Sequence, residues 1–445
     1  MIISFSVENF KSFRDKTTLS FEADTTLPDM NPGNVVEIGG YRLLKTLGIY
    51  GANASGKSNM IAAMANFVGN MFVASNEELP FYPYKLEDQY LEKPTCYKIA
   101  FLMYDSNPIH YEYSYSHTGD RIHSEVLYQN GNLVFERKSD GTLTLTDHFS
   151  QAYFKPEDKS NYINIFSGLL SGALKNQLYI SLIGREKVRT FIHEVVNDLF
   201  WKILLEWFMV NTSSSYRNTN QDINAKPGFK DFLLSVLDAS DINIADVTVK
   251  QKKEPDPINF PLKNDATTYK LLFEPEDHME VKLFHSPNRD TAFTLDEESE
   301  GTKTLYGMSA VLYHSLVERN GRLMLQDELD RSLHPLLTRF ILQLFHREAT
   351  NPHNAQLLYT THDISLLDLR KVRPDQIYFT EKGQDGASRL VRLSDYEINW
   401  EELRTPDNIN KLRDWFLAGA FAGSPSIFNS FIFDYEEEEN ISRSI

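Results

Sequence analysis

A phosphate-binding loop near the amino end is the feature that most restricts how this chain can fold. The segment LGIYGANASGKSN, Leu47–Asn59, contains a glycine, four residues, and then Gly-Lys-Ser. It begins within TLGIYG, a run typical of a buried strand, and leads into a segment with helical spacing. This order predicts an α/β nucleotide-binding core in which backbone N–H groups face phosphate oxygens. The candidate contacts are Gly51, Ala52, Asn53, Ala54, Ser55, Gly56, Lys57, Ser58 and Asn59.

Two side chains of this loop have expected roles of their own. Lys57 would neutralise the β and γ phosphate oxygens, which makes it a candidate catalytic residue, and the Ser58 hydroxyl would be a ligand of Mg²⁺. GTPases, kinases, helicases and transporters all carry such a loop, so the loop alone indicates a ligand and leaves the function open.

A pair of carboxylates follows a second apolar strand. In GRLMLQDELD, Gly321–Asp330, the run Leu323–Leu325 leads to Asp327 and Glu328. Adjacent carboxylates at a strand end are costly without a cation to offset them. Asp327 is therefore expected to hold Mg²⁺ through water, and Glu328 to orient or deprotonate the attacking water.

Two further segments complete the series. In LLYTTHDISLLD, His362 comes directly after a strand, where its imidazole could bond the γ-phosphate or the attacking water. In DEESEGTKTLYG, Ser299 and Gly301 precede an amphipathic helix whose first N–H groups would bind an anion. Because the Asp327 strand follows that helix, we expect this loop to lie far from its own phosphate loop and to serve the nucleotide of a second subunit.

In this order the four elements resemble those of ABC-type ATPases, the group that includes SMC, RecF and OLD-family proteins. GANASGKSN is similar to their Walker A segment, SEGT to the signature loop, LMLQDELDRSLHP to Walker B with the D-loop, and TTH to the switch-histidine segment. GTPases lack the late series, and a transporter-like LSGGQ is absent. The resemblance implies an α/β fold, an ABC-type ATPase head: a P-loop core with an N-terminal antiparallel β lobe, interrupted by a helical insertion.

Within this group the chain looks most like the RloA-like, abortive-infection-type ATPases of bacteria. FSVENFKSFRD, the β-rich residues 81–140, DELDRSLHP and WFLAGAFAGSPSI carry that resemblance. It implies ATP and Mg²⁺ as cofactors, a homodimer or a higher even-numbered oligomer closed head to head around ATP, and a role in antiphage defence. No nuclease signature is visible in the chain, so a nuclease-like effector would be a separate protein.

Three other residues have open roles under this resemblance. Arg14, in the turn between the first two strands, either reaches the nucleotide or lies on the surface. Gln177 is either the Q-loop glutamine or an ordinary helix residue. Ala420 stands where the RloA-like family has an arginine, so the role of that arginine is in doubt here.

Changes of pattern along the chain predict four parts. Residues 1–160 form the first ATPase lobe with Walker A and a β-rich subdomain, and 161–268 form a mainly helical insertion. Residues 269–400 form the second lobe, with strand, helix, strand, helix and strand, and 401–445 form a C-terminal helix and acidic tail. VRTFIHEVVNDLFWKILLEWF is expected to be an amphipathic helix, and the polar run Asn211–Asp222 a mobile loop.

Composition narrows the class of protein. The 445 residues leave room for one large domain or for two to three ordinary ones. The single cysteine, Cys96, excludes an intramolecular disulfide framework, and no apolar run reaches the roughly 18 residues of a membrane span, so we expect a cytoplasmic protein. The net charge of −17 argues against a general nucleic-acid coat, although GREKVR and KQKK are short basic candidates.

Three functions remain open from the sequence. The first is an ATP-driven switch that controls a partner effector in defence. The second is a DNA-binding ATPase of the RecF or SMC kind in repair or recombination, and the third is a scaffold that binds ATP without turnover. The intact Asp327, Glu328 and His362 argue against the scaffold.

Overall fold

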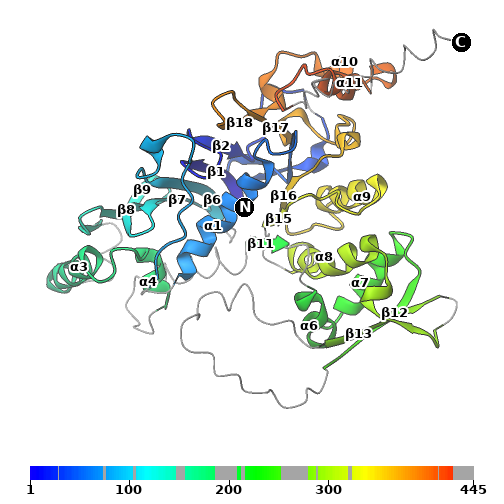
Figure 1. Cartoon of the computed structure of the whole chain (residues 1–445), viewed down its shortest axis with the longest axis horizontal. Coiled ribbons are helices and arrows are strands. Elements are labelled where there is room, and N and C mark those ends of the chain that lie inside the picture. Colours follow the sequence, from blue (N-terminus) through cyan, green and yellow to red (C-terminus); the bar gives the residue numbers. More distant parts are fainter. Residues whose placement is uncertain are drawn as a thin grey trace, which may run out of the picture.

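The structure of the chain is a computed structural model, and Figure 1 shows how its elements are arranged. It describes residues 1–28, 30–73, 77–103, 107–146, 156–185, 208–211, 216–251, 279–286, 289–318, 323–408 and 410–423. Within these ranges no helix is long and apolar enough to cross a membrane.

An antiparallel sheet of seven strands forms the amino-terminal lobe, in the order β10-β9-β8-β7-β6-β1-β2. Its strands are β1 (Ile2–Glu8), β2 (Thr17–Ser20), β6 (Thr95–Met103), β7 (Ile109–Thr118), β8 (Arg121–Gln129), β9 (Asn132–Lys138) and β10 (Leu143–Leu145). The strands expected in the first 22 residues and in the β-rich region are confirmed. Asn130 and Gly131, with φ of 48° and 77°, make the tight turn between β8 and β9 that the Asn-Gly pair predicts.

The nucleotide-binding core is a second sheet, in the order β11-β15-β16-β5-β17-β18, in which only β18 runs antiparallel to its neighbour. Its strands are β5 (Thr46–Gly51), β11 (Phe208–Asn211), β15 (Leu323–Gln326), β16 (Gln356–Thr360), β17 (Ile377–Lys382) and β18 (Ser388–Arg392). Helices α1 (Lys57–Gly69) and α9 (Pro335–His346) follow β5 and β15 in the chain. Since parallel strands bring their carboxyl ends to one edge, the loops after β5, β15 and β16 meet there.

This sheet is buried on both faces, and successive side chains enter different hydrophobic cores. Along β15, Leu323 and Leu325 pack with the antiparallel lobe and α1. Met324 between them packs with the C-terminal elements. A strand covered on both sides has no polar face, which explains why the strands after the phosphate loop read as continuous apolar runs.

A third part of the chain lies beside the core sheet and carries the predicted signature segment (Figure 1). It contains α6 (Arg217–Ala225), α7 (Phe229–Asp238) and α8 (Glu300–Leu316), with a small sheet of β12 (Ile244–Gln251), β13 (Met279–His285) and β14 (Ala292–Phe293). The remaining elements are α3 (Pro156–Ser171), α4 (Tyr179–Arg185), the hairpin β3 (Val35–Ile38) and β4 (Tyr41–Leu44), and α10 (Trp400–Leu403) with α11 (Lys411–Leu417).

The expectations for the middle of the chain need correction. The range expected to be a mainly helical insertion also supplies β11, which pairs with β15 in the core sheet, and β12, which pairs with β13. The polar run expected to be a mobile loop includes most of α6, because its Thr219 and Asn220 side chains bond to Tyr306 of α8. These long-range contacts have no local signal. Most of the expected aromatic helix at 188–208, four residues of GREKVR, the last two residues of KQKK and the acidic tail lie outside the described residues.

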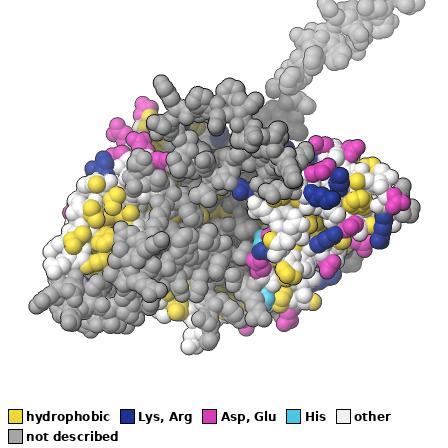
Figure 2. Space-filling model, turned by 90° about the horizontal axis from the view of Figure 1, so that it is seen from below, with side chains coloured by type: hydrophobic (Ala, Val, Ile, Leu, Met, Phe, Trp, Pro, Cys, Tyr) yellow, Lys and Arg dark blue, Asp and Glu magenta, His cyan; other side chains and the backbone are white. Residues whose placement is uncertain are grey.

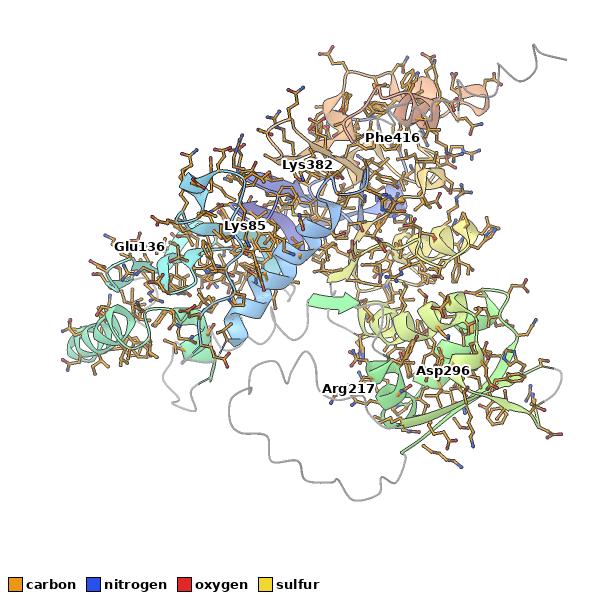
Figure 3. All side chains as sticks on the ribbon, viewed as in Figure 1. Lys85, Glu136, Arg217, Asp296, Lys382 and Phe416 are labelled. Carbon is orange, nitrogen blue, oxygen red and sulfur yellow. The ribbon has the colours of Figure 1, made fainter. Side chains whose placement is uncertain are left out.

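The C-terminal segment packs back on the core sheet. Phe416 of α11 stacks on Phe379 of β17 with ring centroids 5.2 Å apart, and Phe421 stacks on the same ring at 5.3 Å. Figure 3 shows Phe416 in this segment and Lys382 at the end of β17. The contacts bring residues near 420 to the strand beside β5.

The buried His117 of β7 predicts a loss of stability in acid. Its Nε2 accepts from Asn70 Nδ2 at 3.1 Å and its Nδ1 donates to Thr118 O at 3.1 Å, so the neutral ring is satisfied on both sides. Burial lowers its pKa from 6.5 to about 4. The unfolded chain therefore binds one more proton between these values, and stability is lost as pH falls through that window. From pH 7 to 5 the free energy of unfolding should fall by about 2 kcal/mol from this residue.

Urea unfolding at pH 7 and pH 5 measures this effect. The side chain of His117→Gln cannot be protonated, so the free energy of unfolding of this variant should fall by about 2 kcal/mol less between pH 7 and pH 5. An unchanged pH dependence in the variant would show that folding does not lower the pKa of His117.

Candidate nucleotide-binding site

The loop after β5 has the form of a phosphate cradle. Gly51 and Gly56 have φ of 151° and 117°, and helix α1 begins at Lys57 with no side-chain cap on its first N–H groups. Uncapped N–H groups at a helix start are ready donors to an anion. Lys57, 5% exposed, donates from Nζ to Gly51 O at 2.9 Å and Ala52 O at 3.0 Å, so its ammonium lies over the loop.

Contacts from distant parts of the chain hold this loop in shape. Ser55 Oγ and Thr380 Oγ1 are 2.6 Å apart, and Ser388 Oγ donates to Ser55 O at 2.6 Å. A Cβ on Gly51 would lie 2.5 Å from Thr380 O, so only glycine fits beside β17. A Cβ on Gly423 would lie 3.1 Å from the Gly51 Cα, which places the C-terminal segment directly against the cradle.

The other predicted loop residues lie as follows. Asn53, Ala54 and Ser58 are exposed, and Ala54 has the left-handed φ of 60°. Asn59 faces the other way and donates to Ser12 Oγ at 2.7 Å. The turn between β1 and β2 therefore contacts the cradle through Ser12.

Arg14 lies in that same turn and is surrounded by carboxylates. Its guanidinium forms ion pairs with Glu87 at 2.7 Å, Asp15 at 2.9 Å and Asp385 at 3.1 Å. The hydrogen bonds that its guanidinium donates to Asp15 and Glu87 raise its pKa still further above its usual range. Arg14 is thus tied to three carboxylates in the turn that contacts the cradle through Ser12, and its contact with nucleotide stays a prediction.

The carboxylate pair stands at the end of β15, and Thr360 of β16 holds both members. Thr360 Oγ1 donates to Asp327 Oδ1 at 2.5 Å and accepts from the Glu328 backbone N–H at 2.8 Å. Glu328 has φ of 50°, a left-handed value that costs a non-glycine residue energy and persists only where the surroundings impose it. Its side chain is 45% exposed, at the edge where substrate would bind.

His362 follows β16 and lies between the two loops, because β16 runs between β15 and β5. Its backbone N–H donates to the Asp330 carboxylate at 3.2 Å and 3.3 Å, and its side chain is exposed. Asp330 therefore couples the segment after Walker B to the switch histidine.

The charge of Lys57 in the cradle interacts with the charges of the nearby carboxylates. Burial lowers the pKa of Lys57, while the charges of Asp327, Glu328 and Asp330 act on it in the opposite direction. The lysine thus lies within the field of the three carboxylates. The structure brings the Walker A and Walker B residues to one edge, as the sequence predicts.

The signature segment lies at the start of α8. Ser299 caps α8 by accepting from Thr302 N at 3.2 Å, and a Cβ on Gly301 would lie 3.0 Å from Ser332 O. The signature loop therefore packs on the segment just after Glu328. In Figure 1, α8 and α1 lie on either side of β11, and Figure 3 shows Arg217 and Asp296 in the part that carries α8.

These residues fit a nucleoside triphosphate with Mg²⁺. The cradle supplies a lysine and uncapped helix N–H groups for phosphate oxygens. Ser58 offers an exposed hydroxyl, and Thr360 occupies only Oδ1 of Asp327, which are the oxygen ligands that Mg²⁺ prefers.

A protein-family comparison decides the family. Residues 47–368, most of the chain, match the model described as "AAA domain, putative AbiEii toxin, Type IV TA system". The chain belongs to this family. This AAA domain spans the segments that resemble Walker A, the signature, Walker B and the switch histidine, and the expected mixed α/β fold is confirmed.

Most of the chain is also similar to several solved structures, at low sequence identity. A Smc head domain with an extended coiled coil, derived from Pyrococcus furiosus, is 15% identical and has a TM-score of 0.42, with 91% of this chain and 99% of that chain covered. The SMC head from Thermotoga maritima is 12% identical with a TM-score of 0.38, covering 89% and 99%. The recombination mediator RecF with ATP is 14% identical with a TM-score of 0.38, covering 88% and 97%. No curated protein matches the chain.

Sequence reasoning missed several residues that shape the site: Ser12, Thr360, Asp330, Thr380, Ser388 and Gly423. Thr360 and Asp330 lie within the quoted TTH and DELD segments, so the motifs themselves offered a signal. The other four act through tertiary contacts. Gln177 is buried beside the lobe sheet, where its carbonyl accepts from Arg137. Ala420 is exposed at the end of α11.

Thr360→Val should lower the rate of ATP hydrolysis about 10- to 100-fold. The change keeps the shape of the side chain but removes the hydroxyl that holds Asp327 and Glu328, and a bond to a charged group is worth about 1.5–3 kcal/mol. Steady-state kinetics measures kcat. Thr338→Val is the matched control, because the Thr338 hydroxyl is buried and has no partner among the described residues. Equal values of kcat in the two variants would show that ATP hydrolysis does not depend on the Thr360 hydroxyl.

Proposed function

We propose that the protein is a Mg²⁺-dependent ATP hydrolase that acts as a nucleotide switch. The observation that supports this most is the meeting of Lys57 with Asp327 and Glu328 at one edge of the parallel sheet. A cradle without carboxylates would only bind phosphate, and carboxylates without a cradle would only bind a cation. Together they provide the parts for phosphoryl transfer to water.

Each residue has one task in this proposal. Lys57 and the N–H groups at the start of α1 hold the phosphates. Ser58 and Asp327 hold Mg²⁺, which when bound offsets charge on the phosphate oxygens. Glu328 orients the attacking water and accepts its proton, and His362 bonds to the water or the γ-phosphate.

A second copy of the chain would complete the site. The Ser299 hydroxyl accepts from Thr302 N of its own helix, and Ser299, Gly301 and the start of α8 would together form the surface offered to a partner. Signature and D-loop touch through Gly301 and Ser332, so both would meet the nucleotide of the other copy together. We therefore propose a homodimer, or a higher even-numbered assembly, that closes head to head.

For the biological role we propose control of a separately encoded effector, a nuclease or toxin, in antiphage defence. The description of the family, which names a toxin of a type IV TA system, supports a role of this kind. The net charge of −17 also favours a protein partner over a nucleic-acid coat. Figure 2 supports this too: on the face it draws, described basic side chains are interspersed with acidic ones and form no continuous basic surface.

Co-purification with the product of the neighbouring gene, with and without ATP and Mg²⁺, tests the proposal. We expect ATP-dependent association with an effector and weak DNA binding by the protein alone. Tight DNA binding that requires ATP and falls steeply with salt, without association of an effector, would instead establish the RecF- or SMC-like alternative.

A further inference from the structure

A cavity behind the switch histidine is separate from the nucleotide site. It has a volume of about 240 Å³ and lies between α9, the segment Ser365–Val372 and the turn Asn31–Asn34. Its size is below the roughly 300–1,000 Å³ of pockets that enclose a whole drug-sized ligand, so it suits one end of a larger molecule or a small anion.

The walls of this cavity are cationic although the protein is acidic. Arg339, Arg347, Arg370 and Lys371 line it, and the one lining carboxylate, Asp368, pairs with Arg370 at 2.8 Å. The other three cations form no ion pair with a described residue. In a chain of net charge −17, a pocket with three unpaired positive groups is selective for an anion.

The polar groups of the cavity are fixed in place. Asn31 Nδ2 donates to Leu369 O and Val372 O, both at 3.1 Å, and Asn34 Nδ2 donates to Lys371 O at 2.8 Å. These bonds hold the rim that presents Lys371. Ser365 Oγ is buried with no partner among the described residues, which leaves a hydroxyl free to donate to a ligand.

We infer that this cavity binds a phosphate group. Arginine side chains match phosphate oxygens with paired N–H groups, and Ser365 adds a hydroxyl donor. The phosphate is either that of a small anion or the terminal phosphate of a nucleic-acid strand.

The position of the cavity links its occupant to the ATPase site. Arg339 donates to Ser365 O at 2.8 Å, and Ser365 follows His362 by three positions in the chain. A phosphate that draws Arg339 away from this carbonyl would loosen the segment that carries the switch histidine. This regulatory consequence rests on the proposed function, whereas the binding itself does not.

Binding is tested in the Lys57→Ala background, in which the cradle no longer holds phosphate. The probes are pyrophosphate, a 5′-phosphorylated single-stranded oligonucleotide and the same oligonucleotide with a 5′-hydroxyl, measured by calorimetry. We expect at least one phosphorylated probe to bind, and Arg339→Gln with Arg347→Gln to weaken it at least about tenfold. Arg413→Gln is the control, because Arg413 also donates to Ser365 O but does not line the cavity.

Binding of pyrophosphate alone identifies a small anion, and binding of the 5′-phosphorylated strand alone identifies a strand end. The assignment would be overturned if neither probe binds, or if the 5′-hydroxyl strand binds as tightly as the 5′-phosphorylated one. It would also be overturned if Arg413→Gln weakens probe binding as much as the double variant does. In the chain with Lys57 intact, the bound probe should change the rate of ATP hydrolysis at least about twofold. The probe should leave that rate unchanged when Arg339→Gln and Arg347→Gln are also present. If binding is present without that change, only the regulatory consequence fails.

Discussion

Lys57→Ala should weaken ATP binding by at least about 100-fold. The Lys57 ammonium is buried over the cradle and already donates to two carbonyl oxygens, Gly51 O and Ala52 O. With nucleotide, the same N–H groups can turn to phosphate oxygens. Charge-assisted hydrogen bonds are worth about 1.5–3 kcal/mol each, so losing two costs about 3 kcal/mol or more.

Calorimetric titration with ATP and Mg²⁺ measures the dissociation constant. Lys45→Ala is the matched control: Lys45 is also 5% exposed and also has a pKa lowered by burial, but it lies just before the opposite end of β5. The control should bind ATP normally. Equal weakening in both variants would show a general loss of the fold around β5.

Glu328→Gln should slow ATP hydrolysis by about 100- to 10,000-fold while ATP binding is retained. The amide keeps the size of the carboxylate but cannot accept a proton. The backbone bond from Glu328 N to Thr360 Oγ1 does not involve the side chain, so the left-handed turn should persist. The variant should accumulate as an ATP-bound dimer, because opening would wait on hydrolysis.

Single-turnover kinetics and sedimentation with ATP measure these two effects. Glu381→Gln is the control, since Glu381 is also partly buried and stands near the end of β17 in the same sheet. Hydrolysis by Glu328→Gln at the wild-type rate would show that another group accepts the proton.

Local pattern was enough for the parts of the site that are continuous in sequence. The strand, glycines and lysine of Leu47–Asn59 predict the cradle, because the loop conformation depends on those residues themselves. The apolar run before Asp327 predicts its strand for the same reason.

What the sequence did not reveal depends on residues that meet only in the fold. Thr380 lies beside Gly51 because β17 pairs with β5, and Gly423 reaches the same point because Phe421 stacks on Phe379. Arg14 was a nucleotide candidate by its place in the turn. No signal in the sequence indicates that it forms ion pairs with Glu87 and Asp385, which lie far away in the chain.

A mixing experiment tests most directly whether two copies share each site. Lys57→Ala disables the cradle and Ser299→Arg disables the signature loop, so each variant alone should be inactive. In a mixed dimer, one site would combine the intact cradle of one copy with the intact signature of the other. Random pairing should then restore about a quarter of the wild-type ATPase rate. If the mixture stays as inactive as either variant alone, the site is not shared between copies and the account of a closed dimer is wrong.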